Sequence, residues 1–184
     1  MTVRHVLFGV ALAATFAASA ASSFAQAKMT ASQMVDPKIL VARIDANCAV
    51  FANAIKSQPA TDVVRRGTTV WKLASDGDIA VAEKTATVVS YAKVWKQSGN
   101  YVWAHVVTHD AKGDARASQL CFRTDGSLAR VRQATTIASL NAASARQAYY
   151  NVDGSLIRKS AAFAVDDPSI YKAVRSLPFF KILP

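Results

Sequence analysis

Apolar residues recur at helical spacing directly after Asp36 and Pro37. The apolar positions are Leu40, Ile44, Cys48, Phe51 and Ile55. Steps of three and four residues place such positions on one face of a helix. Aspartate is a good N-cap, and proline fits the first helical position because its missing N–H would be unpaired there. The pattern therefore predicts a long helix that begins at Asp36 and Pro37 and ends before Pro59.

From Thr61 onward the pattern changes to short segments that are rich in Val, Thr, Trp and Tyr and are separated by turn signals. We predict strands at 62–74, 79–83, 86–96, 100–109, 115–123, 127–136, 146–152 and 155–165. Asp-Gly and Gly-Asn pairs between them suit tight hairpins because glycine accepts a positive φ. Segment 137–145 fits either a short helix or an irregular crossing.

The order of these elements predicts an α+β fold. A long N-terminal helix packs on a curved antiparallel β-meander, and a short C-terminal helix begins at Asp167 and Pro168 and ends near Ser176. The sequence Asp-Gly-Ser-Leu-x-Arg occurs at 125–130 and again at 153–158. Two copies are fewer than a repeat architecture needs, so we interpret them as similar hairpins.

The first 27 residues have the three parts of a signal peptide. Arg4 is followed by an apolar stretch, Val6–Ala18, and by the cleavage pattern Ala25-Gln26-Ala27. Cleavage there leaves a single exported domain at 28–184, although a cut after Ala20 or an uncleaved anchor also fits the pattern. No later apolar run is long enough to span a bilayer, which takes about 20 residues. We therefore expect a periplasmic or secreted protein without a transmembrane segment in its mature chain.

The chain is basic, with a net charge of +10, of which Arg4 in the leader contributes one unit. Such an excess favours anionic partners, including anionic lipid, acidic polysaccharide and nucleic acid. The basic residues are scattered, however, and this arrangement favours a basic surface without a dedicated polyanion site. Export makes nucleic acid the least expected of these partners.

The two cysteines of the mature chain, Cys48 and Cys121, predict a disulfide because exported proteins fold in an oxidising compartment. A reactive Cys121 with His105 as its base is the alternative. A two-residue turn at Asp125 and Gly126 would pair Cys121 with Arg130. A three-residue loop with a left-handed Gly126 would pair it with Ala129. We predict the three-residue loop, because it places Cys121 on an apolar surface that a helix can cover.

Other catalytic chemistries find little support in the sequence. His105 and His109 lie on one predicted strand, where four steps of about 3.3 Å separate them too far for one metal ion. Glu83 is the only glutamate, and most aspartates occupy turns or helix starts. The chain contains no nucleophile elbow, phosphate loop or dinucleotide fingerprint. We therefore predict no metal and no cofactor, and an enzyme is not the favoured interpretation.

The favoured function is a non-enzymatic binding or interaction module of the cell envelope. Its ligand, apolar or anionic, would lie between the helix and the sheet. The predicted lining residues are Trp95, Tyr101 and Trp103, with Arg130 and Arg132 as anion contacts at the rim. The partner would be a small ligand or an envelope protein. A hydrolase without a recognisable motif and a basic surface protein that binds envelope polyanions are the alternatives.

Overall fold

The computed structural model describes residues 35–67, 69–74, 78, 89–109, 114–137, 142–160 and 170–184. The predicted signal peptide and the predicted strand at 79–83 lie outside these residues. The described residues belong to one compact unit.

Helix α1 spans Pro37–Ala54, and a short 3-10 turn at Ile55–Ser57 follows it. The Asp36 side chain accepts a hydrogen bond of 2.8 Å from the backbone N–H of Lys38, so the predicted N-cap is confirmed. The prediction of a helix at the N-terminus does not match, because α1 begins 36 residues into the chain. Among the described residues, no helix combines the length and the apolar character that crossing a bilayer requires.

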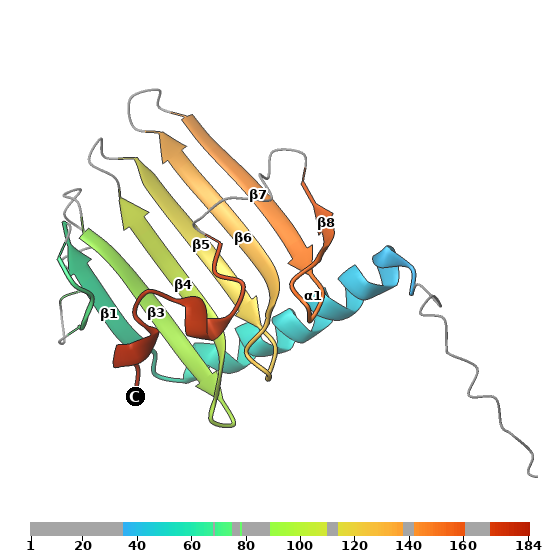
Figure 1. Cartoon of the computed structure of the whole chain (residues 1–184), viewed down its shortest axis with the longest axis horizontal. Helices are drawn as coiled ribbons and strands as arrows, with labels where there is room; N and C mark the ends of the chain where they lie inside the picture. The colour runs from blue at the N-terminus through green and yellow to red at the C-terminus, as the bar shows by residue number, and fades with distance from the viewer. Residues whose placement is uncertain are drawn as a thin grey trace, which may run out of the picture. The chain divides into compact units, whose positions relative to one another are not determined.

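Within the described residues, eight antiparallel strands form one sheet in the order β2-β1-β3-β4-β5-β6-β7-β8. The strands are β1 Thr61–Arg66, β2 Lys72–Leu73, β3 Val89–Gln97, β4 Asn100–His109, β5 Ala115–Phe122, β6 Leu128–Ile137, β7 Ala142–Tyr150 and β8 Leu156–Lys159. Strands β3 to β8 follow one another as a meander, as predicted, and Figure 1 shows α1 crossing one side of it. The α+β class is therefore supported.

Three predicted elements differ from the structure. The predicted strand at 62–74 is a hairpin of β1 and β2. In the ambiguous segment 137–145, the described residues are strand, because β6 ends at Ile137 and β7 begins at Ala142, and residues 138–141 lie outside the description. The start of the predicted C-terminal helix, at Asp167 and Pro168, lies outside the described residues, and its described part contains only a 3-10 turn at Val174–Ser176. A second 3-10 turn, Phe180–Ile182, follows Pro178.

The two faces of the sheet are covered by different parts of the chain. One face, which we call the C-terminal face, carries a cross-strand row of buried apolar residues, Val94, Ala104, Leu120, Val131 and Ala148. They pack against Ile170, Val174, Leu177 and Phe179 of the C-terminal segment and against Trp71. The opposite face, which we call the helix face, carries Trp95, Trp103, Cys121, Arg130 and Tyr149 and packs against α1. Figure 1 shows the C-terminal segment and α1 on opposite sides of the sheet.

Bulges between strands decide which residues reach each face. The β3–β4 pairing shifts between Trp95 and Lys96, so that Trp95 faces Trp103 while Lys96 faces Tyr101. Val102 is the extra residue, and it is buried in the helix-face cluster. Tyr101 therefore points to the C-terminal face, where its hydroxyl donates to the carbonyl oxygen of Pro184 at 2.5 Å.

A second bulge corrects the predicted pairing of Cys121. The loop has three residues, as predicted, and Gly126 has a φ of 82°. The β5–β6 pairing then shifts, so that Cys121 faces Arg130 and not Ala129. The loop prediction is thus confirmed and the predicted partner is wrong, because Ala129 is an extra residue in the returning strand.

Candidate ligand-binding groove

A disulfide joins α1 to the centre of the sheet. Cys48 lies on the buried side of α1, and Cys121 lies on β5 with 1% of its surface exposed. The bridge has a Cα–Cα distance of 5.9 Å and closes a separation of 73 residues. The predicted disulfide is therefore confirmed, and Cys121 has no thiol in this structure to serve as the nucleophile of the alternative prediction.

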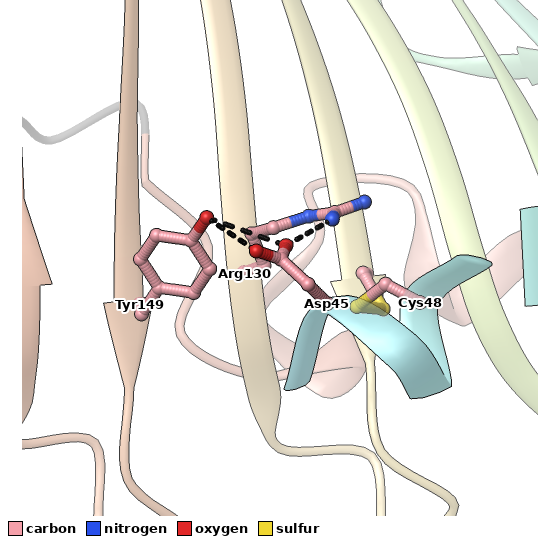
Figure 2. Close-up of polar contacts among 5 residues, drawn as sticks. Asp45, Cys48, Arg130 and Tyr149 are labelled. Atoms are coloured by element: carbon pink, nitrogen blue, oxygen red, sulfur yellow. Dashed lines mark hydrogen bonds and ion pairs between the residues drawn. A yellow bond between two sulfur atoms is a disulfide. The ribbon is translucent and has the colours of Figure 1, made fainter. Parts of the chain in front are cut away.

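One turn before Cys48, a carboxylate on α1 meets an arginine and a tyrosine of the sheet. Asp45 accepts a hydrogen bond of 2.6 Å from an Nη of Arg130 and one of 3.0 Å from the hydroxyl of Tyr149. Figure 2 shows both side chains directed at the Asp45 carboxylate, beside the disulfide. The cluster ties α1 to β6 and β7, as the disulfide ties it to β5.

Arg130 of this cluster is buried, so its charge depends on Asp45 for neutralisation. The Arg130 side chain is only 7% exposed, whereas the Asp45 side chain is 39% exposed at the edge of the groove. A buried guanidinium needs a counter-charge because its transfer out of water is costly. The Arg130 guanidinium also lies 5.9 Å from the centre of the Trp103 ring. Arg130 is thus held by Asp45 and by the Trp103 ring and has a structural role.

The same surroundings keep the Tyr149 hydroxyl protonated. Burial raises the pKa of Tyr149 above its usual value, and its hydrogen bond to Asp45 raises it further. The positive charges of Arg130 and Arg132 act in the opposite direction but are smaller influences. Tyr149 therefore serves as a donor to Asp45 and not as a base.

A groove of about 710 Å³ lies between α1 and the sheet, next to this cluster. Four of the five predicted ligand contacts line it, namely Trp95, Trp103, Arg130 and Arg132. The fifth, Tyr101, lines a different hollow near the hairpin turns and the C-terminal segment. The β3–β4 bulge is the physical reason for this separation.

Arg132 differs from Arg130 although both line the groove. Its side chain is exposed, and among the described residues it forms no ion pair and no hydrogen bond. Cross-strand pairing places Arg132 beside Gln119 and Gln147, and Gln119 beside His105. These four residues, which we call the polar row, run across β4, β5, β6 and β7. An anion bound at Arg132 would therefore meet further hydrogen-bonding side chains on its own strand neighbours.

Sequence reasoning missed Asp45, Tyr149, Gln119 and the place of His105 in this groove. Asp45 precedes Cys48 by three residues, so the two share a face of α1. That spacing was a signal that a carboxylate would sit beside the disulfide. No comparable local signal marks Gln119, because its position in the polar row depends on the pairing of three strands.

Metal chemistry has no visible basis in the described part of the chain. His105 and His109 lie four residues apart on β4, as the strand prediction required. No group of three or more His, Cys, Asp or Glu side chains among the described residues is arranged to hold a metal ion.

No known protein family, curated protein sequence or solved structure matches this chain. Its function has to be inferred from the chemistry of the groove.

Proposed function

We propose that this chain is an exported, non-enzymatic binding module that holds a small anionic ligand in the groove between α1 and the sheet. The observation that carries the proposal is the contrast between two arginines in one groove. Asp45 neutralises Arg130, whereas Arg132 stands exposed without an ion-pair partner among the described residues. The groove therefore keeps one guanidinium for an anion from outside, and a guanidinium matches carboxylate or phosphate in geometry.

The size and rigidity of the groove support a ligand site. Its volume of about 710 Å³ lies within the usual range for small-molecule sites. The Cys48–Cys121 bridge and the Asp45 cluster fix α1 against three strands. A site that is held open before binding loses less conformational entropy when the ligand arrives. Trp95, which is partly exposed, offers an apolar wall beside Arg132.

The proposed location is the periplasm or the exterior of the cell. Disulfides form and persist in oxidising compartments. The Cys48–Cys121 bridge supports this location, and the predicted signal peptide at 1–27 supplies the route.

The first experiment is native mass spectrometry of the protein purified from its export compartment. We expect a small anionic adduct that is retained in the gas phase and released on unfolding. The same spectra establish the mature N-terminus and the loss of two hydrogens in the disulfide. Binding of the released compound is then measured by titration with Arg132→Gln, for which we expect a loss of at least tenfold in affinity.

Arg158→Gln is the matched control. Arg158 lies opposite Tyr149 on β8 and is exposed, but it does not line the groove. The change removes the same charge from the same face of the sheet, so affinity should stay within twofold. Equal losses in the two variants would instead indicate salt-sensitive binding to the basic surface as a whole, and would overturn the proposed site.

A further inference from the structure

The helix–sheet groove continues along the sheet beyond the end of the helix cover. A second groove of about 370 Å³ adjoins it and shares His105, Gln119 and Arg132 with it. The polar row therefore forms the boundary between the two grooves. On one side lie α1 and the tryptophans, and on the other side the sheet carries the exposed residues Ala134 and Ala145.

The floor of the second groove is apolar and shallow. Ala117, Ala134 and Ala145 face one another across β5, β6 and β7 and line this groove. We call these three residues the alanine row. Ala134 and Ala145 are exposed, and Ala117 packs against the buried pair Tyr91 and Val107. Side chains of one carbon leave open, apolar space directly beside the long side chain of Arg132.

The two formally charged residues that line the second groove are both basic. They are Arg132 and Arg146, and no aspartate or glutamate is found among its described lining residues. Arg146 donates to Gln133 at 2.6 Å, which leaves Arg132 as the arginine without a partner in the described part of the chain. The groove thus joins an apolar floor to an unneutralised cation at its edge.

We propose that the ligand is an anionic amphiphile with one head group and one unbranched apolar chain. Its carboxylate or phosphate head binds Arg132 within the polar row, and its chain lies over the alanine row. This inference rests on the proposed function and deepens it, because it states what the anion is attached to and where the rest of the molecule lies.

Burial of a chain on the alanine row makes a quantitative prediction. Each buried methylene group contributes enough to raise affinity by up to about fourfold. Titration calorimetry with hexanoate, octanoate and decanoate should therefore give an affinity that increases steeply with chain length, at concentrations below micelle formation. Decyl phosphate tests the alternative head group, and 1-decanol tests the need for a charge. We expect decanol to bind at least tenfold more weakly than the better of the two anions.

Two variants fill the floor with large side chains and leave Arg132 in place. Ala134→Trp and Ala145→Phe should abolish the increase of affinity with chain length while leaving hexanoate binding within twofold of the wild type. Ala42→Trp, at an exposed position of α1 outside both grooves, is the matched control and should preserve the increase. Thermal unfolding of each variant shows whether it has kept its fold.

The outcomes separate this inference from the proposed function. If Arg132→Gln weakens anion binding but chain length has no effect, the ligand is not an amphiphile on the alanine row and the groove proposal stands. If chain length matters equally in Ala134→Trp, Ala145→Phe and the wild type, the chain lies elsewhere and the inference is wrong. If Arg132→Gln binds every anion as the wild type does, both proposals fail.

Discussion

The two faces of the sheet are covered in different ways. On the C-terminal face, a short apolar segment packs on a continuous cluster of buried side chains, with Phe179 and Leu177 almost fully buried. On the helix face, α1 covers one end of the strands and is held by a disulfide and by an ion pair. The C-terminal face is an apolar core where that segment covers it and carries the buried polar pair Ser118 and Gln133 beyond the cluster. The helix face is a core at one end and a groove at the other.

The difference shows how the cover of each face is held in place. An apolar core can close over a sheet without any specific pairing, because burial is non-directional. A half-covered face needs directional contacts to hold its cover in place, and the Asp45 cluster provides them. These contacts hold α1 over Arg130 and Tyr149, and Arg132, two residues further along β6, is exposed to solvent. The groove is therefore a consequence of incomplete coverage by α1.

Removal of the disulfide is expected to have the largest effect, and it acts on the helix face. For a separation of 73 residues, the chain-entropy model predicts that Cys48→Ala/Cys121→Ala loses about 4 kcal/mol of unfolding free energy. Urea unfolding measures the loss, and a reductant should lower the wild type to the same value while leaving the variant unchanged. A loss below about 1 kcal/mol would show that the packing of α1 does not depend on its covalent link.

Truncation of the C-terminal face tests the opposite cover. Phe179 is 1% exposed, and its ring lies 4.9 Å from that of Trp71. Phe179→Ala should cost about 3 kcal/mol, because it leaves a cavity in a packed cluster. The matched control is Phe180→Ala at the next position, which is 37% exposed and should cost less than about 1 kcal/mol in the same urea titration. Similar costs for both would mean that the C-terminal segment is not part of the core.

Breaking the ion pair is the next step down in size. Asp45→Ala leaves the Arg130 guanidinium buried without a counter-charge and should cost about 2 kcal/mol, less than for a fully buried pair because Asp45 is partly exposed. Adding Arg130→Met removes the uncompensated charge. The double variant Asp45→Ala/Arg130→Met should therefore be more stable than Asp45→Ala alone. If the second change lowers stability further, Arg130 stabilises the fold through contacts other than Asp45.

The Asp45–Arg130 pair also marks the limit of what the sequence could predict. The helix start, six of the strands and the disulfide follow from local patterns and from cysteine chemistry, and the structure has them. Sequence patterns disfavour the pairing of Cys121 with Arg130, because an arginine opposite the helix conflicts with an apolar surface. In the structure, Asp45 of α1 pairs with Arg130 and neutralises its charge. In the helical pattern of the sequence, Asp45 is only a polar residue that lies off the apolar face.

The bulges explain the errors in the pairing of Cys121 and in the face that Tyr101 occupies. The Asp-Gly-Ser-Leu-x-Arg sequence forms the same unit twice, a loop with a left-handed glycine followed by a bulge, at Gly126 and at Gly154. In both copies the residue before the arginine is the extra one, so the repeat could have predicted the position of Arg130. No such motif marks the bulge at Val102. Simple alternation along β4 therefore places Tyr101 on the same face as Trp103, whereas the bulge turns it to the C-terminal face.

The smallest expected effect is the loss of the Tyr149 hydrogen bond, and its pH dependence identifies it. Tyr149→Phe should cost about 1 kcal/mol near pH 8, since it removes one donor to Asp45. Burial and Asp45 raise the pKa of Tyr149, so the native state favours the protonated phenol. That contribution is fully present below the unfolded pKa of about 10 and is lost as the pH rises through the higher folded value.

The difference in unfolding free energy between the wild type and Tyr149→Phe should therefore be constant from pH 7 to pH 9 and shrink at higher pH. The comparison with the variant matters because burial also raises the pKa of Tyr171, which is present in both proteins and cancels. A difference that grows above pH 10 would mean that the phenolate is the favoured form in the folded protein. Tyr149 would then be paired with Arg130 or Arg132 and not with Asp45, and a pair with Arg132 would neutralise the guanidinium that the proposed ligand needs.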